Sequence, residues 1–87
     1  WGDIRGACRE YRLGLKVDPS NANLLNSLGV CLAELGRTKE AIKAFSRAAN
    51  AAPQDFMTHY NLGGAYLHRG NLKDAEDALR KAYSLNP

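Results

Sequence analysis

The chain has 87 residues, of which 45% are hydrophobic and 24% are charged, and its net charge is +3. This is the balance of one small soluble domain with a modest core, and so small a charge neither selects nor excludes a class of partner. No apolar run approaches the roughly 20 residues that a membrane-spanning helix needs, so we expect no membrane partner. The chain begins at Trp1 without an initiator methionine, and we interpret it as a fragment of a longer protein. The compartment stays open, with the cytoplasm slightly favoured.

The first helix is predicted to run from Asp3, a candidate N-cap, to about Val17. Its apolar residues recur at spacings of three and four, which places them on one stripe: Ile4, Ala7, Cys8, Tyr11 and Leu15. The segment 18–21 ends this helix and begins the next, because the residue before Pro19 is pushed out of the α region and Asn21 is a good N-cap.

Four further helices are predicted: three over about residues 22–35, 38–51 and 56–69, and a fifth that follows its cap at Asn71 and runs to about residue 85. Their apolar positions again recur at three and four residues, and no alternating β-branched run predicts a strand. The joints between the helices are short, so neighbouring helices must be antiparallel.

Glycines and polar residues mark the ends of these helices. Gly36 and Gly70 follow the second and fourth helices, where a left-handed residue is least costly as glycine. Asn71 is expected to cap the fifth helix, with Asp74 in the carboxylate position of a capping box. Within the helices, Leu28 and Leu62 are expected to be almost fully buried.

A fixed step of 34 residues relates the two halves of the chain. It connects Leu28-Gly29 to Leu62-Gly63, and it also connects Gly36 to Gly70, Ala41 to Ala75, Ala48 to Ala82 and Pro53 to Pro87. The step runs backward as well, from Gly36, Ala41 and Pro53 to Gly2, Ala7 and Pro19. A period in this range indicates a repeat architecture. We divide the chain into a single domain with the second half of a truncated repeat (1–19) and two complete repeats (20–53 and 54–87).

The repeated residues resemble the tetratricopeptide repeat, whose 34-residue unit has the pattern W-x2-L-G-x2-Y, then A-x3-F, then P. The first complete unit has Leu25, Leu28-Gly29, Leu32, Ala41, Phe45 and Pro53 in these columns. The second has His59, Leu62-Gly63, Tyr66, Ala75, Leu79 and Pro87. The departures are Leu25 and His59 for the aromatic residue, Leu32 for tyrosine and Leu79 for phenylalanine.

The resemblance implies an all-α fold, in which five helices form antiparallel pairs that stack as a right-handed α-solenoid. The mid-helix glycines Gly29 and Gly63 agree with it, because each costs roughly 1 kcal/mol against alanine and close helix approach would explain that cost. The resemblance also implies that the first helix of each pair lines a concave groove. Its residues would be Asn23, Asn26, Val30, Ala33 and Glu34 in the first complete unit and Met57, Tyr60, Asn61, Gly64, Leu67 and His68 in the second.

The helix at 56–69 has two apolar stripes. One, which contains Leu62, Ala65, Tyr66 and the stem of Arg69, is expected to face the core; the other contains Met57, Tyr60, Gly64 and Leu67. A helix that is apolar on two sides is either buried on both or binds something. We therefore predict a non-enzymatic scaffold that binds a peptide or protein segment in its groove, without a cofactor.

The alternative is a purely structural or self-associating repeat segment whose truncated ends make the contacts. Because we interpret the array as cut at Pro87, we expect Leu79, Tyr83 and Leu85 to be partly exposed at the C-terminal end in either case. Some family members bind a C-terminal carboxylate through lysine and asparagine. Asn26 and Val30 stand in the first two of those columns, so we expect no useful affinity for acidic C-terminal peptides.

No constellation of catalytic or metal-binding residues stands out. His59 and His68 are nine residues apart on one helix and face opposite sides, so they cannot share a metal ion. His59 occupies a packing column and is expected at the edge of the core. The two cysteines, Cys8 and Cys31, are expected to be buried free thiols, with a mutual disulfide as the alternative.

Basic residues recur at spacings of 4, 3 and 4 on the first helix, on what repeat logic makes the outer, convex face. They are Arg5, Arg9, Arg12 and Lys16, continued by Lys39, Lys43, Lys73 and Arg80. Such a face could bind an acidic partner or nucleic acid. Glutamates and aspartates interrupt it, however, and no aromatic residue lies among the basic ones to stack on bases. We interpret it as a solvated face and do not expect nucleic acid binding.

Overall fold

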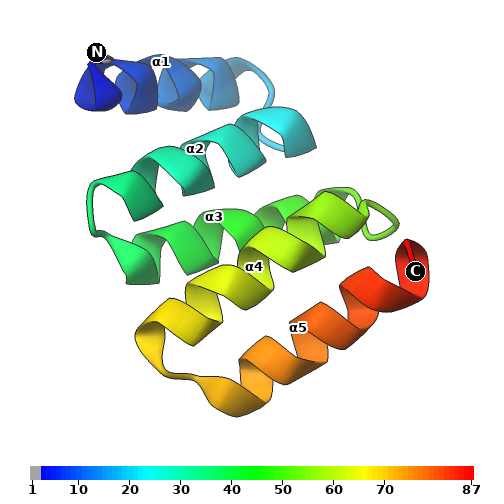
Figure 1. Ribbon diagram of the computed structural model, residues 1–87. Helices are drawn as coiled ribbons and strands as arrows, with labels where there is room; N and C mark the ends of the chain where they lie inside the picture. Colours follow the sequence, from blue (N-terminus) through cyan, green and yellow to red (C-terminus); the bar gives the residue numbers. More distant parts are fainter. Residues whose placement is uncertain (1–2) are drawn as a thin grey trace.

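The computed structural model describes residues 3–87, so the predictions on Trp1 and Gly2 lie outside the described residues. Within 3–87 the chain forms five α-helices and no strand: α1 (Ile4–Val17), α2 (Ala22–Glu34), α3 (Thr38–Ala51), α4 (Phe56–Arg69) and α5 (Leu72–Leu85). Figure 1 shows the helices following one another through the stack in chain order, with α1 and α5 at opposite ends. This confirms the predicted all-α solenoid of stacked antiparallel helix pairs.

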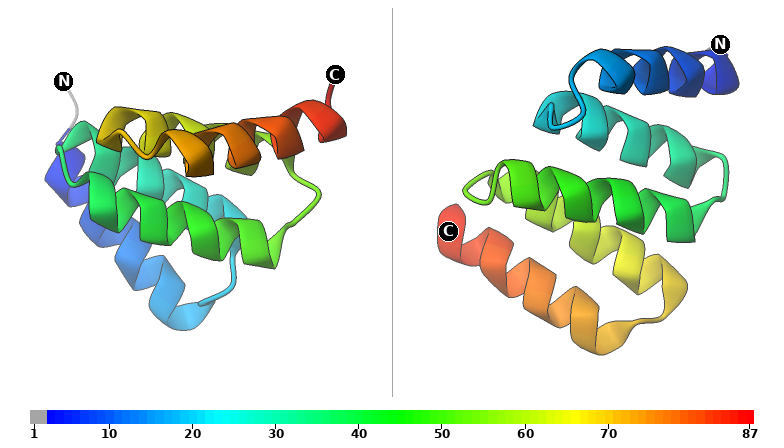
Figure 2. Two further views of the ribbon diagram at one scale, coloured as in Figure 1. Left: turned by 90° about the horizontal axis from the view of Figure 1, so that it is seen from below. Right: turned by 180° about the vertical axis from the view of Figure 1, so that it is seen from behind.

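The two helices predicted to line the groove, α2 and α4, contact each other directly. Each also packs on the helices before and after it in the chain, so α2 touches α1 and α3, and α4 touches α3 and α5. Figure 1 shows α4 in front of α3, and the view from behind in Figure 2 shows α3 in front instead. One face of the stack is therefore formed by α2 and α4 together.

Side-chain caps begin most of the helices as predicted. The side chain of Asp3 accepts a hydrogen bond from the backbone N–H of Gly6, and that of Asn21 accepts one from Leu24. Asp55 caps α4 in the same way. These bonds satisfy backbone donors that the first turn of a helix leaves unpaired.

The capping box predicted for α5 does not form. Asn71 stands at the N-cap position, but its side chain makes no capping bond. Its ψ is 75°, compared with 105° at Asn21 and 106° at Asp55. Asp74 therefore acts only through its charge near the helix N-terminus.

The C-terminal ends of α2 and α4 use the two predicted glycines. Gly36 and Gly70 have φ values of 79° and 89°, the left-handed region in which a side chain would be strained. Both lie in tight joints that return the chain antiparallel to itself. The glycines therefore fix how α3 leaves α2 and how α5 leaves α4.

The core is centred on α2 and α3. One cluster of buried residues comes from α1, α2 and α3, with Ala65 from α4: Cys8, Leu15, Leu25, Leu28, Cys31, Leu32, Ala41, Ala44, Phe45, Ala48 and Ala65. Three alanines of α5, Ala75, Ala78 and Ala82, are buried as well. Leu28 is buried as predicted, but Leu62 is only half-buried, because it packs against the edge of this cluster. The stem of Arg69 was wrongly assigned to the core, since this residue ends α4 and is exposed.

A missing side chain lets α2 and α3 approach closely. A Cβ atom built on Gly29 would lie 2.5 Å from Cε1 and 2.6 Å from Cδ1 of the Phe45 ring, and that ring is only 3% exposed. The second unit repeats the arrangement, with Cγ and Cδ2 of Leu79 2.7 Å from the same point on Gly63. The neighbouring Gly64 differs, because a Cβ atom there would meet nothing within 4 Å.

Gly29 and Gly64 form a matched pair for a stability test. Both lie inside helices, so alanine should gain up to about 1 kcal/mol of helix propensity at either position. At Gly64 we expect that gain to appear in the free energy of unfolding. At Gly29 the displaced Phe45 ring should reverse it, with a net loss of roughly 1–3 kcal/mol from overpacking. Urea denaturation of Gly29→Ala and Gly64→Ala would measure both, and equal shifts for the two variants would contradict the packing described.

Cys8 of α1 and Cys31 of α2 are both buried and both free thiols, in agreement with the prediction. Burial, together with a hydrogen bond to Cys8, raises the pKa of Cys31 from 9.0 to about 11. The thiolate is the nucleophilic form of cysteine. A thiol that is buried and kept protonated is therefore chemically inert while the chain is folded.

The raised pKa of Cys31 predicts slow thiol labelling. With a disulfide reagent at pH 8, we expect negligible reaction of the folded chain and two equivalents of thiol after guanidinium is added. The raised pKa of Cys31 also contributes to the free energy of unfolding. This contribution is fully present below pH 9, the ordinary pKa of the thiol, and is lost as the pH rises toward 11, because the thiol of the unfolded chain releases its proton first. Rapid labelling of the native chain at pH 8, with α-helical circular dichroism intact, would refute the burial of this pair.

Candidate functional site

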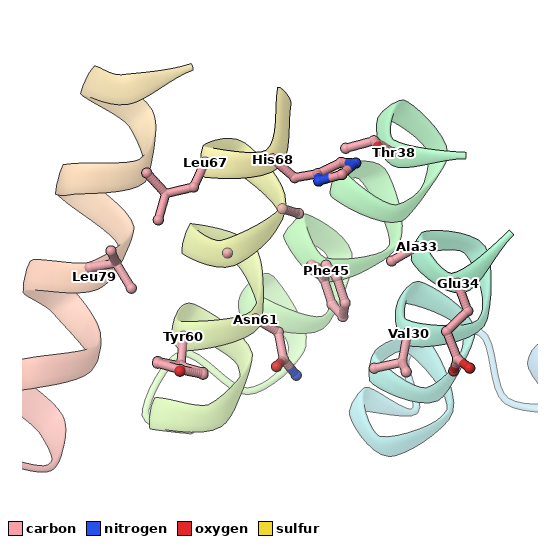
Figure 3. Close-up of a pocket in the computed structure, with 12 residues that line it drawn as sticks. Val30, Ala33, Glu34, Thr38, Phe45, Tyr60, Asn61, Leu67, His68 and Leu79 are labelled. Atoms are coloured by element: carbon pink, nitrogen blue, oxygen red, sulfur yellow. The ribbon is translucent and has the colours of Figure 1, made fainter. Parts of the chain in front are cut away.

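A hollow lies on the face formed by α2 and α4, and we call it the α2/α4 groove. It is open to solvent and has a volume of about 600 Å³, a size typical of ligand sites. Its lining residues come from four helices: Val30, Ala33 and Glu34 of α2, Thr38 and Phe45 of α3, Tyr60, Asn61, Gly64, Ala65, Leu67 and His68 of α4, and Leu79 of α5. Figure 3 shows these side chains around the space between the helices.

Most of the residues predicted for the groove line it. They are Val30, Ala33, Glu34, Tyr60, Asn61, Gly64, Leu67 and His68. Tyr60, at the wall near α5, is 59% exposed. Gly64 has no side chain and lies beside open space, so the backbone of α4 is accessible there. Figure 3 shows Leu67 directed toward Leu79 and α5, whereas His68 is directed toward Thr38. The apolar side chains therefore gather on the α4 side, toward α5.

Three predicted residues, Asn23, Asn26 and Met57, do not line this groove. Asn23 and Met57 are exposed near the first turns of α2 and α4. Asn26 is part of the contact between the two helices, because its Nδ2 donates a 2.7 Å hydrogen bond to Oγ1 of Thr58. Its Oδ1 is buried without a partner among the described residues.

Thr58 is the middle of a short polar chain that sequence reasoning missed. Its hydroxyl accepts from Asn26 and donates to Oδ2 of Asp55, and Oδ1 of the same carboxylate caps α4 at Met57. Thr58 is completely buried, so its hydroxyl needs these partners. The available signal was that Thr58 stands 34 residues after the apolar Leu24. A threonine in a buried column is expected to have a hydrogen-bond partner for its hydroxyl.

The floor of the groove was also missed. Phe45, Ala65 and Leu79 line it, although none of the three was predicted for the groove. Phe45 and Ala65 were assigned to packing positions, and Leu79 to a packing column that is partly exposed at the C-terminal end. The Phe45 ring fills the space left by Gly29, and its other side reaches the groove. Thr38, in the first turn of α3, completes the wall opposite His68.

The groove carries few charges. Glu34 and His68 are exposed and are the only titratable side chains of the lining apart from Tyr60. The second histidine, His59, is half-buried outside the groove, where its Nε2–H donates to the Pro53 carbonyl over 2.9 Å. No group of three or more metal-ligating side chains occurs within residues 3–87.

The basic residues of the outer face are all exposed, and several have acidic neighbours. Arg12 of α1 lies 3.5 Å from Glu40 of α3, Lys73 lies 3.7 Å from Asp77, and Arg80 lies 3.5 Å from Glu76. Exposed pairs of this kind contribute little to stability, but they break up the positive field. None of the helices in the described part of the chain is long and apolar enough to cross a membrane.

Comparison with known proteins identifies relatives whose sequence similarity covers most of this chain. Protein O-mannosyl-transferase TMTC3 of Homo sapiens is 36% identical over 81 residues, which is 90% of this chain and 9% of that protein. The Peroxisomal targeting signal receptor of Candida glabrata is 34% identical over 76 residues, or 87% of this chain and 13% of that protein. The chain thus spans only a small part of the curated relatives it matches.

Among solved structures, the crystal structure of MamA is 33% identical, with a TM-score of 0.93 over 98% of this chain and 50% of that one. A family model described as Tetratricopeptide repeat matches residues 20–87, which include both complete units of the 34-residue period. The chain therefore belongs to the tetratricopeptide repeat family, whose members are generally non-enzymatic scaffolds that mediate protein–protein interactions.

Proposed function

We propose that the α2/α4 groove binds an extended, mostly uncharged segment of a partner protein, with Tyr60 as the principal contact, and that the chain performs no chemistry itself. The observation that carries this proposal is the exposure of large apolar side chains on one concave face of a small domain. Tyr60, Val30 and Leu67 are all exposed along it. Contiguous exposed apolar residues mark interaction sites more often than single ones do.

Tyrosine suits the role of principal contact for three reasons. It offers a large apolar surface, it has few rotatable bonds to immobilise, and its hydroxyl can pair with a backbone group. Tyr60 lies between the α2/α4 groove and a second hollow of about 290 Å³ that contains Phe56 and Tyr83. A bound segment can therefore cover the ring from more than one side, which is the setting in which such residues contribute most to affinity.

The residues beside Tyr60 favour an extended backbone as the ligand. Asn61 lines the groove, and its amide can both donate to and accept from a peptide group without reading the side chain that follows. Gly64, one helical turn from Tyr60, leaves open space where a ligand backbone can approach α4 closely. This would explain why α4 contains a second mid-helix glycine, at a position where a side chain would meet no other group.

The name of one relative supports a protein segment as the ligand of the groove. One of them is, by its name, a receptor for a peroxisomal targeting signal, and its likeness covers most of this chain. The transferase relative is matched over 9% of its length, so this likeness does not extend the transferase activity to the present chain. The Met57 and Asn23 side chains, exposed just outside the groove, can contact the parts of a segment that run past Tyr60.

Substitution of Tyr60 tests the proposal. Linear peptides selected from a random displayed library on the 87-residue chain serve as probes, and fluorescence anisotropy measures their Kd. Tyr60→Ala should weaken binding by about 30-fold, which is roughly 2 kcal/mol. Its thermal unfolding should stay nearly unchanged, because the side chain is mostly exposed.

Two further variants control this experiment. Gly64→Leu should block the groove sterically while the fold stays as stable as before or gains, since the new side chain enters open space. Arg9→Glu on the outer face should leave the Kd unchanged. Loss of binding with Arg9→Glu, together with retention with Tyr60→Ala, would move the site to the outer face and refute the groove as the binding surface.

The charge of the groove predicts which ligands it rejects. Its lining contains the Glu34 carboxylate and no lysine or arginine, so a peptide with an acidic C-terminus would meet a like charge and no cation to offset it. We expect titration calorimetry with such a peptide to detect no binding at about 1 mM, a weak-affinity limit. Tight binding that weakens as salt is added would contradict this.

A further inference from the structure

Cys8 and Cys31 meet at the contact between the first two helices. α1 packs on α2, and Figure 1 shows the two helices as neighbours in the stack. The two side chains are only 3% and 7% exposed, they belong to the same buried cluster, and a hydrogen bond joins their thiols. They are the only two cysteines of the chain, so both of its thiols lie at one point of the core.

The repeat indicates that this contact does not need sulfur. One step of 34 residues later, the same two positions hold Ile42 and Ala65, which are half-buried and buried. Apolar side chains without any reactive group therefore suffice where one helix pair packs on the next. Two touching cysteines can do what Ile42 and Ala65 cannot, which is to form a covalent bond across the contact.

The surroundings of the pair suit a disulfide. Because the two thiols already touch, side-chain rotation and a small approach of α1 to α2 can bring the sulfur atoms to a bond length of about 2.05 Å. The bond would also remove two weak S–H donors from an apolar core. It would close the loop of residues 8–31, which contains the joint between the two helices, and so restrict the unfolded chain.

We propose that the Cys8–Cys31 pair forms a disulfide when the chain folds under oxidising conditions and stays a dithiol when it folds under reducing conditions. The bond fastens the second half of the truncated repeat covalently to the first complete unit. Neither cysteine lines the α2/α4 groove, so this inference does not depend on the proposed function.

The oxidant is a small-molecule disulfide, such as oxidised glutathione. While the chain is still unfolded, one cysteine thiolate attacks it, forms a mixed disulfide and releases one glutathione thiol. The other cysteine then attacks the protein sulfur of the mixed disulfide, which forms the Cys8–Cys31 bond and releases the second glutathione thiol. Two electrons pass from the protein to the small disulfide, and the two protons of the cysteine thiols end on the two glutathione thiols.

Folding then protects the pair from further exchange. Both side chains are buried, and burial together with the neighbouring thiol raises the pKa of Cys31 to about 11, so the folded dithiol contains little of the reactive thiolate. A buried disulfide is equally inaccessible to a small thiol, because exchange requires access to one of its sulfur atoms. The redox state present during folding is therefore retained afterwards.

Refolding of the 87-residue chain tests the proposal. The chain is unfolded in guanidinium and diluted at pH 8 into a reducing buffer or into a mixture of oxidised and reduced glutathione. It is then quenched with acid, denatured and alkylated. The mass should show two alkyl groups after reducing refolding and none after oxidising refolding. The oxidised product should be a monomer with full α-helical circular dichroism and a melting temperature higher by about 10 °C, because the bond restricts the unfolded chain.

Moving one thiol by a single residue provides a matched control. In Cys8→Ala/Arg9→Cys the two cysteines are almost as far apart in the chain as before, but position 9 is exposed on the outer face of α1. This variant should acquire one glutathione and no internal bond. Cys8→Ala alone should have the same melting temperature after both refolding conditions.

Several results would overturn the proposal. Two free thiols after oxidising refolding would do so, as would an internal bond that lowers the melting temperature or the helix content. Equal bond formation in Cys8→Ala/Arg9→Cys would show that proximity in the chain, and not the packing of α1 on α2, closes the bond. The already folded dithiol should keep both thiols in the glutathione mixture, and its closure without guanidinium would refute the retention of the redox state.

Discussion

The contact between the Phe45 ring and the bare backbone of Gly29 sets the geometry of this molecule. The ring occupies the volume that any side chain at position 29 would need, and this brings α2 and α3 close together. Because α4 packs on α3 and touches α2, the same contact determines how far apart the two groove helices lie. Phe45 is therefore both the centre of the core and part of the groove floor.

The period explains how much of the structure the sequence could predict. Helix ends follow from local chemistry at Asn21, Gly36 and Gly70, and these were predictable because capping and left-handed turns involve residues close in the chain. The walls of the groove were predictable for the same reason that the core was, since a repeat fixes which face of each helix is turned outward. Tyr60 and Gly64 could thus be placed from the resemblance alone.

The remaining features depend on contacts between helices. Asn26 looked like a free groove amide, but its partner Thr58 lies 32 residues away and belongs to no repeated column of polar residues. Phe45 and Leu79 were missed as lining residues because one side chain can pack in the core and still border a hollow. Leu62 lies in the column of Leu28, yet it is half-buried, since the cluster that surrounds Leu28 does not extend around α4.

The bond between Asn26 and Thr58 has a consequence for the relative movement of the groove helices. The hydrophobic effect has no preferred direction, whereas a 2.7 Å hydrogen bond between a completely buried and a partly buried group is directional. Thr58 is in turn bound to the residue that caps α4. The two walls are thereby pinned in register near one end, so any opening of the groove must resemble a hinge whose fixed point is this polar chain.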